Sequence, residues 1–215
     1  QDPRVVLEVL VALARLHWSD APGWLREQWN VLALDPSLEH AAMQLLRQSD
    51  NWPAVLKLLD QPTEQTTRTE LRTIAIRALA DQAEISIADG LIERLKSERQ
   101  AARRAESVDV LARIHHRPAA WTYWGFRPEP RPANTVEWER TEPIREAVLR
   151  APEDPDVAVR LTALARMQRE KVPLPLPALA DWLREERDAH RVKTLLDALA
   201  EFPAADVREL QAAIV

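Results

Sequence analysis

Apolar residues recur along the chain at the spacing of one face of an α-helix. Leu71, Ile74, Ala75, Ala78 and Leu79 occupy positions i, i+3, i+4, i+7 and i+8, which lie on one side of a helix with 3.6 residues per turn. The same pattern recurs in six segments, most of which end in Ala-Leu-Ala or a close variant. We therefore predict six helices, each of which buries one face.

These six segments follow one another at a nearly constant distance. Their anchor leucines are Leu13, Leu46, Leu79, Leu111, Leu164 and Leu199. Successive separations are 33, 33, 32, 53 and 35 residues, so one separation exceeds the period by the length of an insertion. Asp-Pro pairs open three of the segments, at Asp2-Pro3, Asp35-Pro36 and Asp154-Pro155. Such pairs are typical of helix starts.

A second, shorter helix fits between successive segments. Its expected ranges are Pro22–Leu34, Trp52–Leu59, Ile87–Leu95, Pro143–Leu149, Pro177–Glu185 and Ala205–Ile214. Two helices in a period near 33 residues are typical of helical-hairpin arrays such as HEAT, armadillo and TPR proteins. The Asp-Pro-x-Val-Arg-like opening, clearest in residues 154–160, favours HEAT. We predict that residues 1–215 form a single all-α solenoid of about six HEAT-like hairpins.

The first predicted helix is apolar on more than one face, because Val5, Val6, Val9 and Leu10 are close together. Terminal repeats of helical arrays normally carry a polar outer face. The chain also begins with Gln1 rather than an initiator Met. We expect a fragment of a longer or processed chain; the alternative is that the end helices are half-repeat caps.

The long separation contains an irregular segment, residues 117–140, with prolines at Pro118, Pro128, Pro130 and Pro132. Prolines at this density predict neither helix nor sheet ladder. One interpretation is that the aromatic side chains of this loop pack over the helices as a hydrophobic clasp. The other is a binding surface for a partner or ligand, because Trp, Tyr and Arg are enriched at binding hot spots. The predicted binding residues are Trp121, Tyr123, Trp124, Arg127, Arg131 and Trp138.

Composition supports a helical protein and excludes several functional classes. Only three glycines occur in 215 residues, whereas sheet turns and phosphate-binding loops depend on glycine. The absence of cysteine excludes disulfide bonds, thiol catalysis, iron–sulfur clusters and covalent haem attachment in this segment. No run of about 18 apolar residues occurs, so we expect no membrane span.

The charge pattern is that of solvated helix faces. The formal net charge is −5 and the sequence pI is about 5.6, with Arg and Glu interleaved. Nucleic-acid binders usually carry a basic stripe or a high pI. We therefore expect other proteins, or other domains of the same polypeptide, as partners, and no nucleic acid. A carbohydrate or a small ligand is kept as an alternative partner, through an aromatic platform on the loop.

The sequence contains no local pattern typical of catalytic or metal-binding residues. The five histidines are His17, His40, His115, His116 and His190, and no two have metal-ligand spacing. The last predicted helix before the loop ends at the adjacent His pair, where a histidine cation favours the helix dipole. Nucleophile-elbow and phosphate-loop motifs are absent. We expect neither enzymatic activity nor a cofactor; a HEAT-like enzyme with residues assembled through space is the alternative.

Three short stretches carry a resemblance to a known group. They are residues 124–128 (Trp-Gly-Phe-Arg-Pro), residues 136–139 (Val-Glu-Trp-Glu) and residues 141–144, which follow the lead-in Leu-Ala-Arg-Ile at 111–114. This order resembles the HEAT-repeat segment of the large multi-domain secreted proteins of planctomycetes and related bacteria. His115 and His116 depart from the pattern, because aromatic or polar residues are expected there.

The resemblance implies a scaffold in an export compartment, periplasmic or secreted, with propeller or dehydrogenase-like and c-type cytochrome modules beyond these ends. A cytoplasmic location is kept as an alternative. The resemblance implies no catalytic residue in this segment. The function expected from the sequence is therefore a non-catalytic helical-repeat scaffold that mediates protein–protein or interdomain docking.

Overall fold

The computed structural model describes residues 2–29, 35–60, 66–120, 123–124, 127–128, 133–172, 176–200 and 202–203. Within these ranges the protein is all-α, with eleven α-helices and strands of only two or three residues. No helix in them is long and apolar enough to cross a membrane. The chain divides into two compact units, residues 1–91 and 92–215, and the division falls inside a helix.

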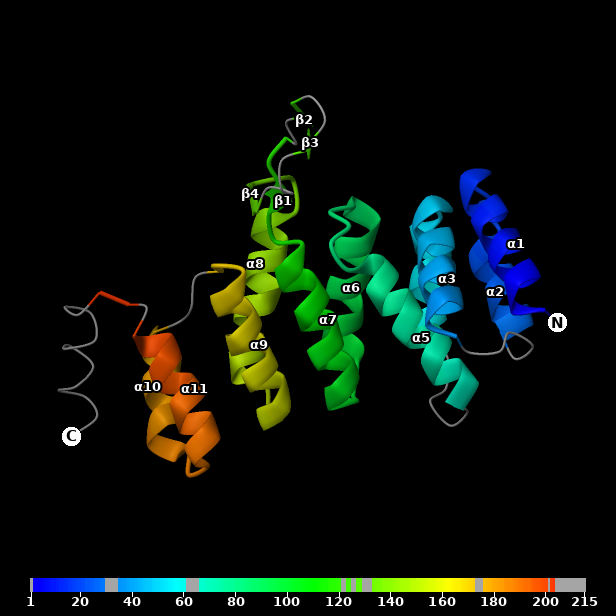
Figure 1. The fold of residues 1–215 in the computed structure, drawn as a ribbon. Coiled ribbons are helices and arrows are strands. Elements are labelled where there is room, and N and C mark those ends of the chain that lie inside the picture. The colour runs from blue at the N-terminus through cyan, green and yellow to red at the C-terminus, as the bar shows by residue number, and fades with distance from the viewer. Residues whose placement is uncertain are drawn as a thin grey trace. The chain divides into compact units, whose positions relative to one another are not determined.

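The first unit consists of packed helix pairs. It contains α1 (Pro3–Arg15), α2 (Ala21–Gln28), α3 (Pro36–Gln48), α4 (Trp52–Lys57), the 3-10 turn η2 (Leu58–Asp60), α5 (Thr66–Leu79) and the first part of α6 (Ile85–Ser97). The long helices pack in sequence order, α1 against α3 and α3 against α5, and the shorter α2 and α4 lie against α3 and α5 (Figure 1). The helices follow one another at the predicted spacing, but α6 has 13 residues, the same length as α1 and α3, so it is not the shorter second helix that the sequence predicts.

The second unit repeats the alternation around an insertion. It contains α7 (Ala101–Arg113), strands β1 to β4, α8 (Thr141–Leu149), the 3-10 turn η3 (Ala151–Glu153), α9 (Val157–Arg169), α10 (Leu176–Glu185) and α11 (Ala189–Leu199). Here α7 packs against α9 and α9 against α11, while α8 lies against α7 and α10 against α11 (Figure 1). The last expected helix, Ala205–Ile214, lies outside the described residues.

Aspartates begin three of the long helices by accepting the backbone N–H two residues further on. Asp2 does so at 2.9 Å and Asp35 at 2.7 Å, as the Asp-Pro openings predict. At α9 the capping residue is Asp156, at 2.8 Å, rather than Asp154 of the Asp-Pro pair. The carboxylate of Asp154 thereby stays available for a side chain of α7.

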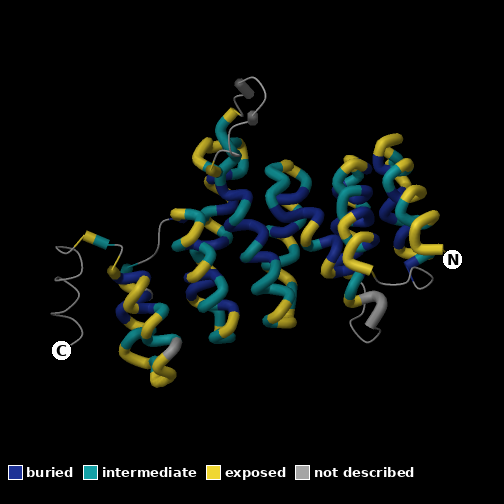
Figure 2. The backbone as a smooth tube through the Cα atoms, viewed as in Figure 1, coloured by how far each residue is buried: buried dark blue, intermediate teal, exposed yellow. Residues whose placement is uncertain are grey.

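The buried positions confirm the predicted helix faces (Figure 2). Five of the six anchor leucines are buried: Leu46, Leu79, Leu111, Leu164 and Leu199. In α1 the buried residues are Leu10 and Ala14, and Leu13 is half-buried. Because Leu10 and Ala14 lie one turn apart, they form the packed stripe of α1, and the expected anchor lies at its edge.

The insertion contains short antiparallel strand pairs, so the prediction that its prolines exclude any sheet ladder is wrong. β1 (Arg117–Pro118) pairs with β4 (Asn134–Val136), and β2 (Tyr123–Trp124) pairs with β3 (Arg127–Pro128). Each pair has two strands, and in such edge strands a proline without an N–H is tolerated. The β2–β3 pair lies farther from α7 and α8 than the β1–β4 pair does (Figure 1).

Candidate functional site

The base of the insertion is tied to the carboxyl-terminal end of α7. The indole Nε1 of Trp138 donates to the carbonyl oxygen of Ile114 at 2.9 Å, and Nδ2 of Asn134 donates to that of Arg113 at 2.9 Å. The last carbonyl groups of a helix have no partner within the helix. The side chains of Asn134, which begins β4, and of Trp138, which follows it, supply partners for these groups, so the insertion is fastened where it leaves the helix.

Thr141, the first residue of α8, joins the two ends of the insertion. Its hydroxyl group donates to the carbonyl oxygen of His115 at 2.8 Å and accepts the backbone N–H of Trp138 at 2.9 Å. The side chain of Thr141 is buried. A buried hydroxyl group that serves as donor and acceptor at once ties the segment before β1 and the segment after β4 to the start of α8.

His115, whose carbonyl oxygen accepts the Thr141 hydroxyl, is 2% exposed. Among the described residues, neither ring nitrogen has a hydrogen-bond partner. Its ring meets that of His116 edge-on, with centroids 4.1 Å apart. Burial, followed by the charges of His116 and Arg145, lowers the pKa of His115 to about 4. At neutral pH the ring is therefore uncharged, so the expected favourable effect of a cation on the helix dipole is wrong for His115.

The predicted binding residues of the loop divide into three groups. Trp121 and Arg131 lie outside the described residues. For Tyr123, Trp124 and Arg127 the backbone alone is described, and Trp124 pairs with Arg127 across the β2–β3 turn. The binding role of these five residues stays a prediction.

Trp138 is the sixth predicted residue, and its side chain is half-buried at the base of the insertion. Its indole N–H is used to hold the chain, as described above. The guanidinium carbon of Arg117 lies over its ring, 4.6 Å from the centroid. This cation–π contact covers part of the ring that a ligand would stack on. The observed contacts of Trp138 are thus those of an anchor.

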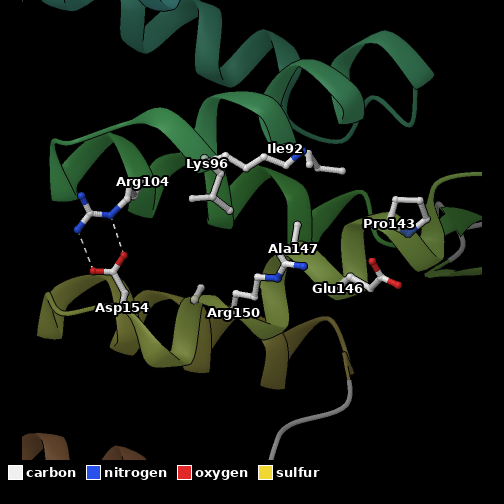
Figure 3. Close-up of a pocket in the computed structure, with 10 residues that line it drawn as sticks. Ile92, Lys96, Arg104, Pro143, Glu146, Ala147, Arg150 and Asp154 are labelled. Carbon is white, nitrogen blue, oxygen red and sulfur yellow. Dashed lines mark hydrogen bonds and ion pairs between the residues drawn. The ribbon is translucent and has the colours of Figure 1, made fainter.

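A cavity of about 650 Å³ lies in the second unit, between the end of α6, α7, α8 and η3. Ile92, Leu95, Ala147 and Ala151 provide apolar lining. Figure 3 shows the side chains of Lys96 and Arg150 extending from opposite sides into this space. The charged lining residues are Lys96, Arg104, Arg150, Glu146 and Asp154.

One end of the cavity is closed by an ion pair. Nε and Nη2 of Arg104 donate to the two carboxylate oxygens of Asp154 at 2.7 and 2.8 Å (Figure 3). The Arg104 guanidinium lowers the pKa of Asp154, and the carboxylate raises the pKa of Arg104. Both side chains are largely buried, at 14% and 10% exposure. The two side chains therefore hold each other in place at this end of the cavity, and their charges neutralise each other.

The first unit contains a wider groove, of about 940 Å³, between α1 and α3. Leu7, Val11 and Ala14 line it from α1, and Ala41 and Gln44 line it from α3. Arg15, His17, His40 and Gln48 are also part of the lining, and no carboxylate is. The groove therefore combines apolar side chains with polar ones and with the cation of Arg15.

Sequence reasoning missed the groove and the cavity as sites, although it noted that the first helix is apolar on more than one face. That second apolar face, with Val5 and Val9, points away from the groove, whereas Leu7 and Val11 belong to the same face of α1 as the buried Leu10 and Ala14. No comparable signal marked the cavity, whose lining comes from segments between residues 92 and 154. Within the described part of the chain, no group of three or more His, Cys, Asp or Glu residues is arranged to hold a metal ion.

No protein-family model matches the chain, and no curated protein matches it in sequence. The structure itself defines the class: an all-α protein of packed long and short helices. The groove and the cavity are the places where it offers concave surface.

Proposed function

We propose that the chain is a non-catalytic α-solenoid of HEAT-like hairpins that docks other proteins or other domains of the same polypeptide. The observation that carries the proposal is the open groove between α1 and α3. We further propose that its occupant is an amphipathic helix with carboxylates on its polar face.

The packing order supports a repeat array. In each unit a long helix packs against the long helix of the next hairpin, as α1 does with α3 and α7 does with α9. Helical repeats that contact mainly the repeats next to them in the sequence are typical of solenoids. Such arrays present extended surfaces for binding rather than enclosed catalytic sites.

The lining of the groove supports a helical, acidic partner. Leu7, Val11 and Ala14 follow one another at helical spacing on α1, so they form a stripe that the apolar face of a partner helix could cover. Arg15 and the two histidines at its edges face no carboxylate within the lining. Close by, the ring of His17 lies 3.6 Å from the exposed carboxylate of Asp50. Arg15 is thus the side chain that a partner carboxylate would meet.

The charged networks support a structural rather than a catalytic role. Arg166 binds Asp109 through Nε at 2.6 Å, which ties α9 to α7, and Arg104 binds Asp154 in the same unit. Catalytic carboxylates generally need a raised pKa or a free face toward substrate. The Asp154 carboxylate has a lowered pKa and both oxygens occupied.

The proposal is tested by titrating the chain with synthetic amphipathic peptides and following binding by calorimetry. We expect a peptide with glutamates on its polar face to bind, and matched peptides with lysines there, or with serines at the apolar positions, to bind at least tenfold more weakly. Val11→Glu places a charge in the groove and should abolish binding. Val9→Glu, on the exposed outer face of α1, is the matched control. Equal binding by the two variants, or preference for the lysine peptide, contradicts the proposal.

A further inference from the structure

We propose that the cavity between α6, α7, α8 and η3 is a binding site for a small amphiphilic carboxylate, meaning an aliphatic chain that ends in one carboxylate group. The site is formed entirely by residues of the second unit. It is separate from the groove of the first unit, so it does not depend on the docking proposal.

The apolar part of the lining fits an aliphatic chain. Ile92 and Leu95 of α6 are half-buried on one side, and Ala147 and Ala151 are their counterparts on the other. The small alanine side chains leave the space open, and the larger aliphatic residues supply the surface that a ligand chain would cover. A volume of about 650 Å³ lies within the range of roughly 300–1,000 Å³ that small-molecule sites have.

The cations of the lining fit a single carboxylate. The guanidinium of Arg150 has no hydrogen-bond or ion-pair partner among the described residues. The Nζ of Lys96 contacts Glu93 of its own helix at 3.1 Å, and both of these side chains are more than half exposed. An exposed pair of this kind contributes little energy. Lys96 is therefore free to turn toward an anion that Arg150 binds.

The anions of the lining do not compete for this position. Asp154 is neutralised by Arg104, as the two short hydrogen bonds show. Figure 3 shows the carboxylate of Glu146 beside Pro143, directed away from the head groups of Arg150 and Lys96. Because Arg104 and Asp154 neutralise each other, the charges left in the lining are those of Lys96, Arg150 and the more distant Glu146. The formal net charge of the chain is −5. A positive local field in an acidic protein favours an anionic ligand.

The test is calorimetric titration of the intact chain with sodium octanoate, with acetate, 1-octanol and octylamine as matched probes. We expect saturable octanoate binding at one site, weaker binding of octanol, and none of acetate or octylamine. A peptide acetylated at its amino end and ending in a leucine carboxylate distinguishes a free acid from a protein terminus. Tighter binding of this peptide than of octanoate would overturn the assignment to a free acid.

Two variants address different parts of the site. Arg150→Gln should weaken octanoate binding about tenfold, because it removes a charge-assisted hydrogen bond. Ala147→Phe should abolish binding, because the ring fills the space of the aliphatic chain. Arg169→Gln, an equal charge change at an exposed position of α9 outside the lining, should leave the affinity unchanged. Circular dichroism establishes whether each variant is folded. If Ala147→Phe is not folded, Arg150→Glu takes its place in the test. Octanoate affinity unaffected by these cavity substitutions would overturn the proposal.

Discussion

Arg104 and Asp154 are 50 residues apart in the sequence, and two guanidinium nitrogens of Arg104 donate to both carboxylate oxygens of Asp154. Nη1 of the same guanidinium donates to the carbonyl oxygen of Arg99 at 2.7 Å. The pair thus joins the connection before α7 to the connection before α9. It does so across the insertion, whose residues separate the two helices in the sequence.

The Arg104–Asp154 pair should contribute strongly to stability. Asp154→Asn removes the charge and leaves a largely buried guanidinium without its counter-ion, so we expect the free energy of unfolding to fall by about 2 kcal/mol. Chemical denaturation measures the change. The matched control is Glu142→Gln, which breaks the exposed pair between Arg145 and Glu142 and should have no measurable effect. Similar losses in the two variants would show that the first pair has no special role.

The hydroxyl group of Thr141 should hold the base of the insertion. Thr141→Val keeps the shape of the side chain but leaves the His115 carbonyl and the Trp138 N–H without their partner, so we expect a loss of about 2 kcal/mol in unfolding free energy. Thr73 is the control, because its exposed hydroxyl donates only to the carbonyl of Thr69 in the same helix. Thr73→Val should change stability by less than about 0.5 kcal/mol. Amide exchange in β1 and β4 should also accelerate in Thr141→Val alone.

Replacing each of two helical glycines by alanine should change the stability of the protein in opposite directions. A Cβ atom at Gly90 of α6 would lie 2.5 Å from a methyl group of Leu56, whereas one at Gly23 of α2 meets nothing within 4 Å. Overpacking against buried Leu56 should make Gly90→Ala destabilising by about 1 kcal/mol, even though alanine favours a helix. Gly23→Ala should stabilise by about 0.5–1 kcal/mol. Thermal unfolding of the two variants measures the contrast, and a stabilised Gly90→Ala variant contradicts it.

His115 should make the protein acid-sensitive. Its pKa is about 4 in the fold, below the ordinary value of 6.5, so between these values the unfolded chain binds a proton that the folded chain does not. Stability therefore falls as the pH drops from about 6.5 to about 4, by up to roughly 3 kcal/mol. His115→Phe removes this contribution, whereas every carboxylate of the chain is present in both proteins. We expect the loss of unfolding free energy between pH 7 and pH 4 to be smaller in His115→Phe than in the natural sequence.

The loop prediction from the sequence has its own test. If the aromatic side chains of the insertion bind a partner, Trp124→Ala should lose binding partners that the unchanged chain retains in a pull-down from the source organism. Trp138→Phe is a useful comparison, because it removes the indole hydrogen bond to Ile114 and probes the anchoring of the same loop. Identical partner profiles for Trp124→Ala and the unchanged chain would contradict the binding interpretation. They would favour the interpretation that the aromatic side chains of the loop pack over the helices.

The helices were predictable because their signals are local. The caps at Asp2 and Asp35, the apolar stripes and the position of the insertion all follow from residues within one or two helical turns of each other. The strand pairs of the insertion were not predictable in this way. Hydrogen bonding between short proline-containing segments depends on how the segments meet rather than on their composition.

The sites required the tertiary structure. Asp154 reads in the sequence as a helix start, yet it binds Arg104 because the connection before α9 meets the start of α7. His115 reads as a cation at a helix end, yet burial keeps it uncharged.

The sequence by itself determined that the chain is all-α, where its helices lie and where their regular alternation is interrupted, because backbone propensity and apolar spacing act over a few residues. Only the tertiary structure decided which charges neutralise each other and where concave surface is left open. Desolvation and ion pairing depend on distances between residues that are remote in the sequence, and packing sets those distances.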